Sequence, residues 1–235
     1  MKKMKSQWFK FKILIFVILA GIIANTAIEN NIKNINTAVT NNKTQVNADK
    51  IEEIKKLQLI NVEIKKQEEI KQKQENLEKK WKIGYDEFFE KKYKQAIETE
   101  RLVLKEEPNF YKAYAVQGIA LAYNGDYKNG MKQIDQALKL KPDYGYARFN
   151  KALANELYGY YDEAIKWYKK DLEVEKFEWS YYGIASIYGR KGDIGNTIKY
   201  LKLAIDINPN IKNAAKNEKD FDNVQDSIKF KELIK

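Results

Sequence analysis

The sequence predicts an all-α fold built from a repeated helical hairpin, and three observations support this prediction. The first is the spacing of the prolines, which are the only three in the chain: Pro142 follows Pro108 by 34 residues and Pro209 follows Pro142 by 67. One unit therefore lacks its proline, and Lys176 stands in that place. The other two observations are small residues and a glycine that return at fixed distances before each proline place.

Small residues return at two of these distances. Those 24 residues before the proline place are Gly84, Gly118, Ala152 and Ala185, and those 12 residues before it are Ala96, Gly130, Ala164 and Thr197. Large side chains return 15 and 11 residues before it, for example Tyr93 and Ile97 in the first unit. Small residues beside large ones are typical of close helix crossings, so each unit is predicted to contain two packed helices.

A turn between these two helices is predicted 17 residues before the proline place, where the chain has Gly125, Gly159 and Gly192. Only the first unit departs from this pattern, because it has Lys91 there. Glycine is common where a helix ends, and aspartate is common where the next one begins. Asp126 and Asp193 fit this second role.

Together these residues resemble the tetratricopeptide repeat family, whose units of about 34 residues are helical hairpins. The resemblance covers residues 77–211 and implies a right-handed solenoid of four repeats, at 77–110, 111–144, 145–177 and 178–211. Glu87, Glu100 and Asp171 stand where apolar or small residues are usual, so the first and third repeats are expected to be the least regular.

The segments that flank the repeats are predicted to have other roles. Residues 212–235 are amphipathic and are expected to form a capping helix over the last repeat. Residues 29–48 are rich in Asn and Thr and are expected to be a flexible linker. Residues 49–80 are expected to form a charged helical stalk, with a coiled-coil dimer through residues 51–64 as the alternative.

The N-terminal residues 1–28 predict that the repeats lie outside the cytoplasm. Five lysines precede an uncharged apolar stretch, residues 13–24, and this order is typical of an export signal. Twelve strictly apolar residues are too few for a helix that spans a membrane. The stretch continues as far as Ile28, however, if the polar residues Asn25 and Thr26 are accepted within it. Two outcomes stay open: an uncleaved transmembrane anchor, or a cleaved signal peptide and a secreted protein.

Composition excludes several classes of function. The chain has no cysteine and no histidine, which excludes disulfides, thiolate nucleophiles, histidine catalysis and the usual zinc sites. The net charge is +10, but residues 1–28 supply +5 of it, so no nucleic-acid surface is predicted. A carboxylate pair remains as a catalytic option, but Asp126, Asp162 and Asp193 stand at turns, where helix capping explains them. We therefore expect no enzyme activity, no cofactor and no metal.

The candidate functional residues follow from the family resemblance, which implies a concave groove lined by the first helix of each repeat. The predicted partner-binding residues are Trp81, Tyr85, Phe89, Tyr123, Phe149, Asn150, Tyr182 and Arg190; Ala115, Ile119, Leu153, Leu157 and Ser186 are their neighbours in the groove. Some members of the family grip a C-terminal carboxylate with a lysine, asparagine and arginine clamp. Trp81 and Tyr85 stand where that clamp would begin, so this mode is not expected.

The predicted function is a non-catalytic adaptor, membrane-tethered or secreted, that binds a protein or peptide partner in the groove. Asn150 and Arg190 are expected to bond that partner's backbone or an acidic side chain. The alternative is a glycan-binding or catalytic component of cell-envelope metabolism, with aromatic residues as sugar platforms. Frequent Lys, Asn and Ile indicate an AT-rich bacterial genome.

Overall fold

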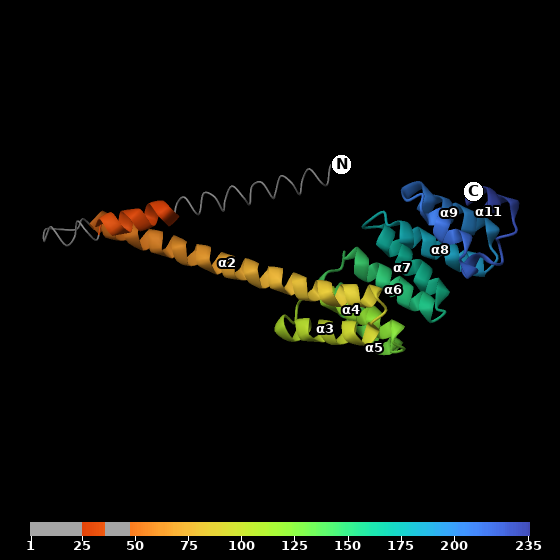
Figure 1. The fold of residues 1–235 in the computed structure, drawn as a ribbon, viewed down its shortest axis with the longest axis horizontal. Coiled ribbons are helices and arrows are strands. Elements are labelled where there is room, and N and C mark those ends of the chain that lie inside the picture. Colours follow the sequence, from red (N-terminus) through yellow and green to blue (C-terminus); the bar gives the residue numbers. More distant parts are fainter. Residues whose placement is uncertain (1–24, 36–47) are drawn as a thin grey trace. The chain divides into compact units, whose positions relative to one another are not determined.

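The computed structural model describes residues 25–35 and 48–235, and all regular structure in these residues is helical (Figure 1). The chain divides into two compact units, residues 1–75 and 76–235. Helix α2 (Ala48–Phe89) begins in the first unit and ends in the second. The all-α prediction is therefore confirmed.

The first unit contains a helix of residues 25–35, which overlaps the first part of the predicted linker, residues 29–48. The linker prediction is wrong for residues 29–35 and for Ala48, which begins α2, and residues 36–47 lie outside the described part of the chain. The physical reason is a spacing of four and three residues between Ile28, Ile32 and Ile35, which places three isoleucines on one helix face. Ile28 is buried and the other two are half-buried.

On α2, the apolar residues within 51–64, which would mediate dimerisation in the alternative to a charged stalk, are partly covered. Ile54, Leu57 and Ile64 are half-buried, and the most exposed apolar side chains, Leu59 and Val62, point to the opposite side of the helix. No described helix, in 25–35 or 48–235, has both the length and the apolar composition needed to cross a membrane. The apolar stretch 13–24 lies outside the described residues.

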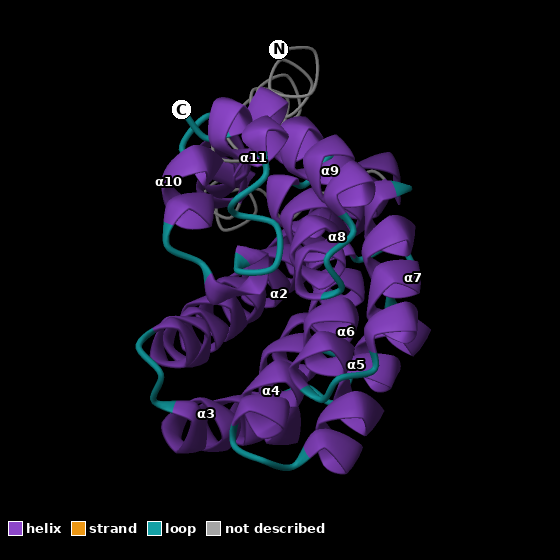
Figure 2. Ribbon diagram, turned by 90° about the vertical axis from the view of Figure 1, so that its right-hand side faces the viewer, coloured by secondary structure: helices purple, strands orange, loops and turns teal. Residues whose placement is uncertain are grey.

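The second unit is a stack of helical hairpins (Figure 2). The four pairs are the end of α2 with α3 (Tyr93–Glu106), α4 (Tyr111–Tyr123) with α5 (Tyr127–Leu140), α6 (Gly145–Leu157) with α7 (Tyr161–Leu172), and α8 (Glu178–Arg190) with α9 (Ile194–Ile207). The first helices contact one another along the stack, α4 with α6 and α6 with α8. This stacking confirms the predicted solenoid.

The hairpin turns share one backbone conformation. Gly125, Gly159 and Gly192 have φ of 94°, 78° and 73°, and Lys91 in the first hairpin has φ of 61°. Lysine pays a steric cost in this left-handed region, which glycine does not. The aspartates after two turns cap the next helix: Asp126 accepts a hydrogen bond from Asn129 N at 3.1 Å, and Asp193 accepts one from Asn196 N at 2.9 Å.

The small residues lie at the helix crossings, as predicted. The tightest crossing joins α4 and α5, where the backbones meet at Gly118 and Gly130. A Cβ on Gly118 would lie 2.7 Å from Gly130 O and 2.6 Å from Ile134 Cγ1. These glycines therefore set the distance between the two helices of this hairpin.

Two of the residues that depart from the repeat pattern, Glu100 in the first repeat and Asp171 in the third, are buried carboxyl groups. The helices that carry them stay intact. Glu100 is fully buried, neither of its oxygens has a hydrogen-bond partner, and burial, followed by the charge of Glu87, raises its pKa to about 9. Asp171 is also fully buried and accepts a hydrogen bond from Ser180 Oγ at 2.6 Å. Burial is the largest cause that raises the pKa of Asp171 to about 7.

The C-terminal cap covers the last hairpin, but it is not the single helix expected for 212–235. It consists of α10 (Ile211–Lys216), a 3-10 turn η1 (Lys219–Phe221) and α11 (Ile228–Leu233). Turn-forming Asn and Asp residues separate these pieces. Five cap side chains are buried in one core with α8 and α9, namely Ile211, Ala215, Phe221, Val224 and Phe230.

Candidate binding face on the first helices

An aromatic ladder runs along the last turns of α2. Trp81, Tyr85 and Phe89 are four residues apart, so they lie on one helix face, and their ring centroids are 5.3 Å and 4.7 Å apart. Tyr146 of α6 joins the ladder, with its ring 5.7 Å from that of Tyr85. Phe89 is 59% exposed, a large fraction for a phenylalanine with a ring already in contact with two others.

The two predicted groove residues of α4 that are small or aliphatic belong to the core instead. Ala115 and Ile119 are both fully buried. Ala115 packs in one core cluster with Tyr146, so its small side chain leaves room for that ring. Tyr123, at the end of α4, is half-buried and lies 5.5 Å from Phe88 and 5.3 Å from Tyr93. Tyr146 was not among the predicted groove residues, although it stands one turn before Phe149 on α6.

In the third hairpin, one predicted residue is half-buried and the other is buried. Phe149 is half-buried and packs on Tyr168 at 5.6 Å and on Phe177 at 5.0 Å. Asn150 is 1% exposed and donates a hydrogen bond to Ala115 O at 3.4 Å. The expectation that Asn150 is free to bond a peptide backbone is therefore not met, because α4 already uses its amide.

In the fourth hairpin, the predicted binding residues contact the C-terminal cap. The ring of Tyr182 lies 5.7 Å from that of Phe221, and Ser186 Oγ donates to Asp220 Oδ2. Arg190 Nη2 donates to Asp220 Oδ2 at 2.8 Å, and the Arg190 backbone carbonyl accepts from Asn223 at 2.8 Å. Arg190 thus holds the cap through hydrogen bonds, whereas the sequence predicted a guanidinium group free to bind a partner.

A buried carboxylate connects Arg190 to the third hairpin. Glu156 of α6 accepts hydrogen bonds from Tyr168 at 2.6 Å and from Arg190 at 3.5 Å, and it shares with Asp220 the single hydroxyl proton of Ser186, whose Oγ lies 3.1 Å away. Burial raises the pKa of Glu156, while these donors oppose the rise. The network therefore joins α6, α7, α8 and the cap through hydrogen bonds to buried groups.

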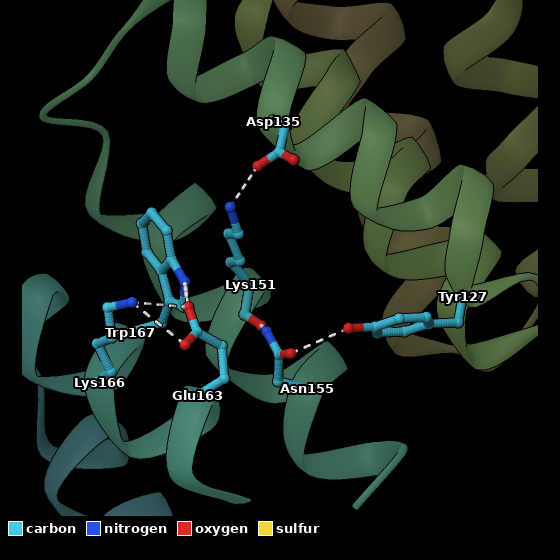
Figure 3. A network of polar contacts seen from close by, with 7 residues as sticks. All are labelled: Tyr127, Asp135, Lys151, Asn155, Glu163, Lys166 and Trp167. Carbon is cyan, nitrogen blue, oxygen red and sulfur yellow. Dashed lines mark hydrogen bonds and ion pairs between the residues drawn. The ribbon is translucent and has the colours of Figure 1, made fainter. Parts of the chain in front are cut away.

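Lys151, another charged residue of α6, is also paired. Figure 3 shows Lys151 of α6 reaching Asp135 of α5 at 2.5 Å, beside the bond from Tyr127 to Asn155 at 3.0 Å. In the same view Glu163 accepts from Lys166 and Trp167, both of α7. Within residues 25–35 and 48–235, no group of three or more acidic side chains is arranged to hold a metal ion.

Comparison with known proteins identifies the repeats. A family model described as tetratricopeptide repeat matches residues 111–144 and 180–211, in the second and fourth hairpins. The "Uncharacterized protein MJ0572" of Methanocaldococcus jannaschii is 36% identical over 63 residues, which are 27% of this chain and 73% of that protein.

Solved structures resemble the fold at low identity. A crystal structure of MamA protein is 23% identical, with a TM-score of 0.47, and the match covers 63% of this chain and 81% of that one. A MamA fragment from Desulfovibrio magneticus RS-1 is 18% identical, with a TM-score of 0.48 over 67% of this chain and 93% of that one. PilW, titled a type IV pilus biogenesis factor, is 16% identical, with a TM-score of 0.33 over 68% and 99%.

Proposed function

The chain belongs to the tetratricopeptide repeat family, and on that premise we propose that it is a non-catalytic adaptor that binds a protein partner on the aromatic ladder of the first repeat. Repeats of this kind stack to build extended binding surfaces, so the family supports the general kind of function. The face proposed here consists of Trp81, Tyr85, Phe89 and Tyr146, with Tyr123 beside it.

The exposure of Phe89 carries this proposal. Aromatic side chains dominate the energetics of protein interfaces, and a phenylalanine that is 59% exposed at the end of a row of contacting rings has much apolar area left to bury. The other end of the stack offers less, because the cap covers Tyr182 and engages Arg190. The proposed face therefore lies in the first three repeats, whereas the residues predicted from the sequence are spread over four.

Replacement of Phe89 by alanine tests the proposal. In native cells, crosslinking to the partner should fall at least tenfold for Phe89→Ala, since loss of an aromatic anchor costs about 2 kcal/mol or more. The matched control is Leu102→Ala, because Leu102 is 53% exposed on α3, the second helix of the same hairpin. Equal capture by both variants, or retention of the repeats on cell-wall polymer without captured proteins, would overturn the adaptor.

The adaptor is further proposed to be tethered to a membrane or secreted, with its repeats outside the cytoplasm. The support is the lysine-rich segment and the apolar stretch, residues 13–24, that follows it. Protease added to intact, wall-stripped cells should digest residues 81–235, and full protection of them would contradict this location. Mass spectrometry of the mature N-terminus distinguishes an anchor from a cleaved signal.

A further inference from the structure

The charges on the proposed face have partners inside the protein, and this constrains what the face can bind. Resting on the proposed function, we propose that the partner segment is uncharged and apolar, and not an acidic or carboxylate-terminated peptide. Such a partner would not need the hydrogen bonds first expected from Asn150 and Arg190.

The first helices α4, α6 and α8 carry six charged side chains, and each has an intramolecular partner. They are Lys112, Arg148, Lys151, Glu156, Glu178 and Arg190. The second helix α5 differs, since Lys128, Lys132 and Lys139 are exposed on it. Charge on α4, α6 and α8 is thus paired within the protein, while the cations on α5 stay accessible.

The two cations nearest the aromatic ladder are themselves held by acids. Lys112 Nζ lies 5.0 Å from the centroid of the Trp81 ring and is bound by both oxygens of Glu78, at 2.7 Å and 2.8 Å. Lys82 Nζ lies 4.8 Å from the centroid of the Tyr85 ring and pairs with Asp86. A partner carboxylate would share each ammonium group with Glu78 or Asp86, whose charge already neutralises it, so it would gain less than at an unpaired cation.

The groups best suited to a peptide carboxylate are already used elsewhere. Arg190 binds the carboxylate of Asp220, which the cap supplies, at 2.8 Å. Asn150 is buried and bonded to Ala115 O. What stays accessible is ring surface at Phe89 and Tyr85, and such surface is complementary to apolar side chains.

Two synthetic peptides test this inference against the full chain in lipid nanodiscs, with empty nanodiscs as the background. Both are about four helical turns long, with Leu and Phe every fourth residue in an Ala and Gln background. One is acetylated and amidated, and the other has a free C-terminal carboxylate and Glu in place of the Gln. Fluorescence anisotropy at about 50 and about 500 mM NaCl gives the affinity and its dependence on salt.

The uncharged peptide should bind with an affinity that changes less than about twofold across this salt range, because apolar contacts are not screened. Phe89→Ala should weaken it about tenfold, whereas Leu102→Ala should leave it unchanged. Tighter binding of the acidic peptide that is lost in salt would overturn the inference, as would no binding of the uncharged one. Either result is compatible with the adaptor as long as Phe89→Ala still lowers capture in cells at least tenfold, so the two failures are distinguishable.

Discussion

At the scale of single residues, a buried carboxyl group limits the stability of the first repeat. Glu100 is fully buried with no partner, and its pKa of about 9 shows that folding opposes its ionisation. The equivalent residues of the second and fourth repeats are Ile134 and Leu201. Glu100→Leu should therefore raise the free energy of unfolding by about 2 kcal/mol near pH 8, measured by chemical denaturation. The control Glu98→Gln should change stability little, because its ion pair with Arg101 is exposed to solvent. An unaltered stability of Glu100→Leu would contradict this view.

The turn at Lys91 offers a second test at this scale. Lys91 adopts a φ of 61°, in the region that its three glycine counterparts occupy. Lys91→Gly should stabilise the chain by about 1 kcal/mol, because glycine enters this region without steric cost. The converse variant Gly125→Ala should destabilise it by a similar amount through conformation alone, since no atom lies within 4 Å of the added Cβ. The melting temperatures of both variants test this prediction. Shifts of the same sign would contradict a shared left-handed conformation at the two turns.

At the scale of helices, the α4–α5 crossing should reject even one methyl group. Gly118→Ala places a Cβ 2.7 Å from Gly130 O, and overpacking of this kind costs about 1 to 3 kcal/mol. The control is Gly195→Ala on α9, where the nearest atom, Asp193 Oδ1, is 3.5 Å away. That control should be neutral or slightly stabilising, because alanine is the better helix former. A melting temperature of Gly118→Ala equal to that of wild type would show that the crossing is looser than described.

The contacts of the cap could not be predicted from the sequence. The fixed offsets of the repeat predicted that Arg190 lies on the first helix of the fourth unit, and the structure has Arg190 at the end of α8. Its partners Asp220 and Asn223 lie in a segment without repeat periodicity, so no offset could indicate that they bind it. Asn150 differs, because its acceptor Ala115 O lies in the preceding repeat, but residue types at fixed offsets do not indicate a bond to a backbone carbonyl. Periodicity thus predicted the helices and their crossings, while individual hydrogen bonds had to come from the structure.

A prediction follows for the contact of Arg190 with the cap. Arg190→Ala removes the donor to Asp220 and Glu156, whose side chains are 18% and 9% exposed. The variant should lose about 1 to 2 kcal/mol of stability, a moderate figure because the guanidinium itself is partly exposed to water. Partner capture by the folded variant should stay at the wild-type level, which circular dichroism and crosslinking together can establish. Loss of capture by a folded Arg190→Ala would return Arg190 to the binding face.

At the scale of the whole molecule, the buried carboxyl groups should make the repeat unit more stable in mild acid. Burial raises the pKa of Glu100, Glu156 and Asp171, so the folded state binds more protons than the unfolded state. Stability must then fall as pH rises, through about 7 for Asp171 and up to about 9 for Glu100. The carboxyl groups with lowered pKa, such as Asp126 and Asp193, are solvent-exposed helix caps, and their contribution is lost only below about pH 4.

The melting temperature should therefore rise as pH is lowered from about 8 to about 5, opposite to ordinary acid denaturation. The double variant Glu100→Leu with Asp171→Ala should flatten this profile, because it removes two of the three groups and restores side chains like those of Leu201 and Ala204 in the fourth repeat. Each single variant should flatten it in part, Asp171→Ala mainly below about pH 7. A wild-type melting temperature that falls steadily from pH 8 to pH 5 would contradict the assignment, because the exposed carboxylates would then dominate the linkage between protonation and folding.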